Sequence, residues 1–251
     1  MQFFGKYSTE FGEEFLTESY LYFNKDGEED LSIEELEALL KTQKLKKKNI
    51  AGTIFMYNPF YYPIGYDEKK SLQSQDFDFD AGFHHLKIER DITMFRASIK
   101  GYEGQLVEVR TLFNLNIKKI DVSEILMALN DDTEMLNTNQ LTQFHKESNY
   151  TDLSNFKING KFIFFAWGHK INQNEFVNIY NYAKAIYDKC VQSQKKIAFV
   201  YRKSTQSDYA VEHYQFLHPL DGAKFKNRMP EALAKAFSTQ PPQSSAFNDL
   251  P

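Results

Sequence analysis

Residues 50–60 read IAGTIFMYNPF, a short apolar run that is stopped by Asn58-Pro59. A run of this kind is typical of a strand buried on both faces of a sheet, and Asn-Pro is typical of the turn that follows. Three more stretches predict strands of similar character. They are 105–116 (QLVEVRTLFNLN), 161–170 (KFIFFAWGHK) and 195–203 (KKIAFVYRK).

Helical patterns separate these strands. Apolar residues at helical spacing or capping residues predict helices over the segments 86–100, 121–132, 174–194 and 229–237. Strands and helices therefore alternate through residues 50–237, and this alternation is typical of α/β proteins. We predict a three-layer α/β/α fold with a mostly parallel central sheet.

The remaining segments predict an extension and a tail. Residues 18–30 (ESYLYFNKDGEED) indicate a short strand and a turn, and 32–48 (SIEELEALLKTQKLKKK) indicate one helix with a Ser cap and a lysine-rich end. We therefore predict an N-terminal extension over 1–49 that packs on the core, an α/β domain over 50–237, and a flexible tail over 238–251.

Composition narrows the class of protein. The chain has 251 residues and a formal net charge of −4, which argues against broad attraction to nucleic acid but leaves room for a local basic groove. Cys190 is the only cysteine, so an intrachain disulfide and a cysteine-rich zinc site are excluded. No apolar run approaches the ~20 residues of a membrane span, and the first residues lack a secretion signal. We expect a cytoplasmic protein with no membrane partner.

Polar and aromatic side chains follow three of the four predicted strands. Tyr57-Asn58 follow the first strand, Asn114 the second and Trp167-Gly168-His169 the third, and His218-Pro219 stand near the end of the domain. In an open parallel sheet, ligands bind outside the carboxyl ends of the strands. We therefore expect these four segments to meet at one edge and to form a single pocket.

The ordered set of motifs carries a resemblance to a known family. Tyr57-Asn58-Pro59, Asn114-Leu115, Ala166-Trp167-Gly168 and His218-Pro219-Leu220 resemble the L-N-P-S, N-L-F, W-G and H-P-L motifs of a bacterial and phage family catalogued as domain of unknown function 1643. The match spans residues 50–237. Phe60 stands where that family typically has Ser.

More distantly, the layout resembles the uracil-DNA glycosylase superfamily, which has an α/β/α domain, an early Asp-Pro or Asn-Pro motif and a late His-Pro motif. That resemblance implies a pocket for a nucleobase in DNA or in a nucleotide. It implies that Asn58 holds a water at the sugar carbon and that His218 stabilises the departing base. It further implies that Phe60 or Tyr61 shapes the pocket floor and that Asn114 reads a base edge.

The other predicted substrate-binding residues surround the same pocket. Phe83 and Trp167 are candidates for stacking on a flipped base, and Tyr57 and His169 belong to the motifs at the edge. Several carboxylates are candidates for assisting the reaction, with none singled out: Asp67, Asp76, Asp78, Asp80 and Asp91. No motif indicates a cofactor or a metal ion.

Alternatives remain beside this hypothesis. The same scaffold suits a non-catalytic interaction module, for instance one that serves phage–host conflict, in place of a DNA N-glycosylase. Residues 24–35 approach a calcium-loop pattern, but Glu29 stands where the loop requires glycine, and a turn followed by a capped helix explains the same letters. His84, His85, His169 and His218 lack the spacing of a known metal motif.

Overall fold

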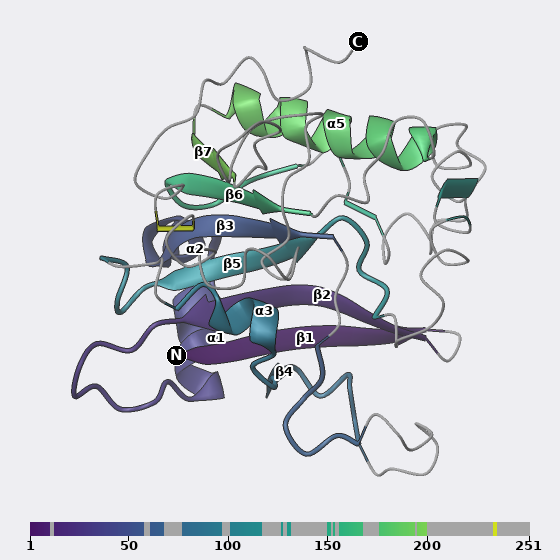
Figure 1. Cartoon of the computed structure of the whole chain (residues 1–251). Coiled ribbons are helices and arrows are strands. Elements are labelled where there is room, and N and C mark those ends of the chain that lie inside the picture. Colours follow the sequence, from purple (N-terminus) through teal and green to yellow (C-terminus); the bar gives the residue numbers. More distant parts are fainter. Residues whose placement is uncertain are drawn as a thin grey trace, which may run out of the picture.

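The computed structural model builds the molecule around one twisted sheet (Figure 1). The residues that it describes are 1–10, 13–57, 61–67, 77–96, 101–116, 127, 130–131, 150–151, 153, 156–167, 176–193, 195–199 and 233–234. Its strands are β1 (Gln2–Glu10), β2 (Glu13–Tyr22), β3 (Ile50–Met56), β4 (Phe83–His85), β5 (Leu106–Thr111), β6 (Phe162–Ala166) and β7 (Lys196–Phe199). Its helices are α1 (Ile33–Leu40), α2 (Gln43–Asn49), α3 (Arg90–Thr93) and α5 (Val177–Gln192).

The sheet formed by the described residues has the order β4-β1-β2-β5-β3-β6-β7. β5, β3, β6 and β7 run parallel to one another, whereas β2 pairs antiparallel with β5 and continues into an antiparallel β4-β1-β2 half. The predicted α/β class and the four predicted strands are confirmed. The sheet is mixed, however, and the expectation of a mostly parallel sheet is corrected in this respect.

The N-terminal segment contributes more to the sheet than its sequence indicates. β1 and β2 form a long hairpin with a register shift between Lys6 and Tyr7, where the sequence predicts only a short strand after Glu18. β1 lies inside the sheet, and Phe3 and Phe4 are both buried, one toward each face. Consecutive buried residues remove the alternating pattern by which a half-exposed strand is recognised.

The predicted helix over 32–48 is two helices. α1 begins with the predicted cap: Ser32 accepts a hydrogen bond from the Glu35 N–H, and the Glu35 carboxylate accepts one from the Ser32 N–H. α1 ends at Leu40, and Thr42 then caps α2 by accepting from the Leu45 N–H. A second capping residue inside a helical pattern starts a new helix because its side chain replaces a backbone acceptor.

The predicted helix over 86–100 is also corrected. Residues 83–85 form β4 on the edge of β1, and the Leu86 N–H donates to the Phe3 carbonyl, so the chain is still extended there. Only Arg90–Thr93 form a helix, α3, and residues 97–100 lie outside the described part. Pairing with β1 overrides the helical spacing of the apolar residues. The predicted helix over 121–132 lies mostly outside the described residues, and so do the tail and most of 229–237.

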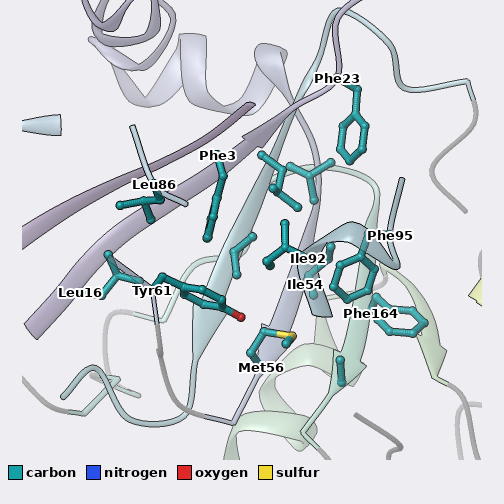
Figure 2. Packing of buried hydrophobic residues seen from close by; sticks show 14 of the residues in the cluster. Phe3, Leu16, Phe23, Ile54, Met56, Tyr61, Leu86, Ile92, Phe95 and Phe164 are labelled. Atoms are coloured by element: carbon teal, nitrogen blue, oxygen red, sulfur yellow. The ribbon is translucent and has the colours of Figure 1, made fainter. Parts of the chain in front are cut away.

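Helices lie on both faces of the sheet. α1 and α5 cover one face, where α1 packs on β1, β2 and β5 and α5 packs on β3, β6 and β7. α3 lies on the other face, where Ile92 and Phe95 pack on Ile54 and Phe164 (Figure 2). The rings of Phe95 and Phe164 meet edge to face, with centroids 5.8 Å apart. Burial of these large side chains is the main source of stability.

The capping box of α1 allows a direct test. We expect Ser32→Ala to lower the free energy of unfolding by about 1 kcal/mol, because the Glu35 N–H then loses its acceptor. Urea denaturation measures the change. Glu34→Ala, in the same helical turn but outside the box, is the matched control and should change stability by less than about 0.5 kcal/mol. Equal effects of the two variants would contradict the assigned cap.

Candidate functional site

The carboxyl ends of β3 and β6 lie side by side. Met56 pairs with Ala166 in parallel register, so Tyr57 and Trp167 follow as neighbours on adjacent strands. The chain forms β3 first, then β5 on one side of β3, and then crosses to β6 on its other side. The edge between β3 and β6 is therefore a topological switch point, where open α/β sheets leave a crevice for ligands.

The end of β5 joins the same edge from the other side of β3. The Leu112 N–H donates to the carbonyls of Met56 and Tyr57, at 3.1 and 3.0 Å. Asn114 follows, and its side-chain oxygen accepts a hydrogen bond from the Thr111 hydroxyl at 3.2 Å, while its carbonyl accepts one from the Leu16 N–H. Three of the four predicted segments thus reach one edge of the sheet.

The aromatic rings at this edge point into the core. Trp167 is 1% exposed and packs against Phe165 and Phe55, with centroids 4.7 and 6.1 Å away. The Tyr57 ring lies edge to face with Phe113, and its buried hydroxyl has no hydrogen-bond partner within the part of the chain that the structure describes. Burial raises the pKa of Tyr57. Neither ring presents an open face for stacking on a base.

Tyr61 lies on the opposite face of the sheet, in the core beneath α3 (Figure 2). Its hydroxyl donates to the Asp91 carboxylate at 2.8 Å, and burial, followed by the charge of Asp91, raises its pKa. The Tyr7 hydroxyl donates to the Tyr61 carbonyl. Tyr57 and Tyr61 therefore lie on opposite faces of the sheet.

Phe83 does not share this edge. It lies in β4, which is separated from β3 by β1, β2 and β5, and its ring packs against Tyr20. The sequence suggests Phe83 only because it is an aromatic residue near a long loop, and the pairing of β4 with β1 takes it away from the predicted pocket. The other predicted site residues, Asn58, Phe60, His169 and His218, lie outside the described residues.

A buried polar network lies next to the edge and was not predicted. Glu14 is 6% exposed and accepts hydrogen bonds from the Asn116 amide at 3.3 Å and from the Tyr66 hydroxyl at 3.4 Å. The Asn116 amide also donates to the Tyr61 carbonyl. Because β2 is antiparallel to β5, the start of β2 brings Glu14 to the end of β5. No local sequence signal links residues 14 and 116.

A pocket of about 420 Å³ opens on the α1/α5 face, over β2 and β5. Its floor includes Glu18 and Tyr20 from β2 and Glu108 and Arg110 from β5; Tyr20 and Glu108 are direct partners in the ladder. Lys46 of α2 lines the pocket on one side. The segment 156–159 lines it on another side, and Asn114 is the one predicted site residue among the described lining residues.

Two ion pairs hold four of the five charged residues that line this pocket in the described part of the chain. Arg110 donates to one oxygen of Glu108 and the Thr53 hydroxyl donates to the other, both at 3.0 Å. Burial disfavours the charge of Arg110, but attraction to Glu108 and the hydrogen bond to it raise its pKa above the ordinary value. In the same way, burial opposes ionisation of Glu18, yet hydrogen bonds from Tyr20 and Lys46 hold its pKa below the ordinary value.

The sequence contains a signal for this pocket. Glu108 and Arg110 alternate with Val107 and Val109 in a strand paired on both sides, and Glu108 is 7% exposed. Charged residues are rarely buried unless they are paired, so alternating charges within a central strand indicate a polar site on one face. Reading residues 105–116 only as an apolar strand misses it.

Within the described segments, no group of three or more His, Cys, Asp and Glu side chains is arranged to hold a metal ion. Asn24, the start of the calcium-like loop, instead donates to the Glu29 carbonyl and the Asp30 carboxylate. No described helix has the length and apolar character needed to cross a membrane.

Comparison with known proteins adds no relative. Neither a family model nor a curated protein nor a solved structure matches this chain.

Proposed function

We propose that this protein binds a nucleobase, in DNA or in a nucleotide, at the β3/β6 edge and cleaves its N-glycosidic bond as a uracil-DNA glycosylase-like enzyme. The observation that carries the proposal is the parallel pairing of Met56 with Ala166, from which the motifs Tyr57-Asn58 and Trp167-Gly168-His169 continue. A switch point in the parallel strand order is where α/β sheets bind ligands.

The residue types fit this chemistry. Cleavage of an N-glycosidic bond builds positive charge on the sugar and negative charge on the departing base, so a hydrogen-bond donor directed at the base lowers the barrier. In the proposed site His218 is that donor. Asn58 orients the attacking water, because an amide cannot remove a proton at neutral pH.

Asn114 has the role of reading the base. Its amide carries both donors and an acceptor, which suits the Watson–Crick edge of a base. The hydrogen bond from Thr111 and the backbone bond to Leu16 hold Asn114 at the end of β5. These two hydrogen bonds favour a fixed orientation of Asn114. A fixed orientation is needed for Asn114 to discriminate between bases.

The test is a screen for free bases released by the full chain. Oligonucleotides that carry uracil, hypoxanthine or each normal base are offered in single-stranded and duplex form at a stated salt concentration. We expect release from at least one of them, and a loss of at least about 100-fold in Asn58→Ala. Asn24→Ala is the matched control, because Asn24 lies past the end of β2, at the opposite edge of the sheet.

The outcomes separate the hypotheses. Release that Asn58→Ala leaves unchanged contradicts the assigned role of Asn58. Binding of the oligonucleotides without any release overturns the enzymatic part and supports a non-catalytic interaction module on the same scaffold. If wild type shows neither release nor binding, the nucleobase proposal is overturned.

A further inference from the structure

The pocket over β2 and β5 is separate from the switch-point edge. It lies on the other side of β3 from β6, and the Phe156 ring, which stacks on Phe55 of β3 with a centroid distance of 6.2 Å, stands at its boundary. A volume of about 420 Å³ is within the range of small-molecule sites. Its polar lining is unusual for a surface that rests on the centre of a sheet.

The carboxylates of the pocket are already neutralised. Glu18 accepts from the Lys46 ammonium at 3.0 Å and from the Tyr20 hydroxyl at 2.8 Å. Glu108 accepts from Arg110 and from Thr53. Lys157 also lines the pocket, is exposed, and has no carboxylate partner among the described residues. Among the described lining residues, three cations and two carboxylates therefore give a net charge of +1.

Arg110 is held in one orientation. Glu108 binds one edge of its guanidinium, and the guanidinium carbon lies 5.6 Å from the centroid of the Phe156 ring. A guanidinium has five N–H donors, and Glu108 accepts one of them. The side chain is 25% exposed, so part of it faces the pocket rather than the core. A planar donor group fixed by a carboxylate and a ring suits an oxyanion.

We propose that this pocket binds a small phosphate-bearing molecule of about mononucleotide size. Arg110 and Lys157 bind the phosphate group, while Thr111 and Asn114 supply hydrogen-bonding groups for the rest of the molecule. The proposal does not depend on base cleavage at the β3/β6 edge, because Asn114 is the only described residue that the two sites share.

Isothermal titration calorimetry on the full chain tests this site. The probes are adenosine 5′-monophosphate, inorganic phosphate, adenosine and succinate. We expect the monophosphate to bind at least 10-fold more tightly than adenosine or succinate. Inorganic phosphate should compete with the monophosphate. No detectable binding of the monophosphate, or equal binding of succinate, overturns the proposal.

The variant must remove the cation without leaving a buried charge. Arg110→Met alone would strand Glu108, so the double variant Glu108→Gln/Arg110→Met is used; its Gln still offers an acceptor to Thr53. We expect at least a 10-fold loss of affinity in this variant with an unchanged circular dichroism spectrum. Should the double variant misfold, Lys157→Gln remains and should weaken binding several-fold.

Two controls complete the design. Lys184→Gln removes a lysine whose partner is Asp188, away from the pocket, and should leave the affinity unchanged. Asn58→Ala should also retain binding of the monophosphate at this pocket. Loss of base release at the β3/β6 edge is thereby distinguished from loss of monophosphate binding at the pocket. Wild-type affinity in both Glu108→Gln/Arg110→Met and Lys157→Gln would overturn the assignment.

Discussion

Raising the pH from 10 to 12 is expected to unfold this protein. Burial raises the pKa of a large set of tyrosines, because a buried phenolate loses its hydration. The set comprises Tyr7, Tyr20, Tyr22, Tyr57, Tyr61, Tyr180, Tyr182 and Tyr187.

The direction of the pH effect on stability follows from the difference between the pKa of each tyrosine in the folded state and its pKa in the unfolded state. Burial raises the pKa of Tyr182 from 10.0 to about 12, so the folded state retains its proton where the unfolded state has lost it. This contribution to stability is fully present below pH 10 and is lost as the pH rises through 12. A difference of two units between the folded and unfolded pKa corresponds to about 3 kcal/mol of stability for one such residue. Several such residues together are comparable with a typical stability of about 5–15 kcal/mol.

Circular dichroism and tyrosinate absorbance, followed together from neutral pH upward, measure this transition. We expect loss of structure and ionisation to coincide. Tyr57→Phe is the informative variant: its hydroxyl has no partner in the described segments, so the variant removes one titrating group without breaking a described hydrogen bond. Its alkaline midpoint should shift upward. Tyrosines that ionise near pH 10 while the native spectrum persists would contradict the expectation.

Replacing Gly160 with alanine is expected to lower the free energy of unfolding by about 3–5 kcal/mol. Gly160 has φ +78°, a conformation that disfavours L side chains. A Cβ there would also lie 2.5 Å from the Ala51 carbonyl carbon and against the Gly52 backbone nitrogen. Backbone atoms of a central strand cannot move aside. The close approach exists because the Lys161 N–H donates to the Ala51 carbonyl at the entry to β6.

Gly27→Ala separates the two causes of this loss. Gly27 has nearly the same dihedral, φ +79°, but a Cβ there would meet no atom within 4 Å. We expect it to cost only the conformational part, about 1 kcal/mol. Urea denaturation of both variants gives the difference, which is the steric part. Similar losses in the two variants would show that residues 160 and 52 do not approach so closely.

Part of the candidate site was predictable from sequence. Asn114 and Trp167 follow strands, as predicted, and parallel strands end at one edge. Asn58 lies outside the described residues. The orientation of the rings could not be predicted, because it depends on packing against α5. The side chains of Tyr57 and Trp167 belong to the same buried cluster as those of α5. Phe83 was assigned to the pocket as an aromatic ring that could stack on a base. Its pairing with β1 involves only three residues of β4 and could not be predicted from them.

The polar sites depend on contacts between distant segments. Glu14 meets Asn116 across 102 residues, and Thr53 meets Glu108 across 55. Neither pair has a local spacing, since each forms only when β2 and β3 pair with β5. The alternation of Glu108 and Arg110 with valines indicates that one face of the strand is polar. It does not indicate which cation or hydroxyl from another segment binds these side chains.

Local signals in the sequence were sufficient to predict the four parallel strands, the long helix α5 and the cap of α1. Apolar runs, helical spacing and a capping residue are local signals, since they act through neighbouring residues along the chain. The strand order, the entry of the β1–β2 hairpin into the sheet and the contact of Thr53 with Glu108 beneath the pocket depend on tertiary contacts. Strand pairing is a choice among distant partners, and its free energy comes from side chains that meet only after the sheet has formed.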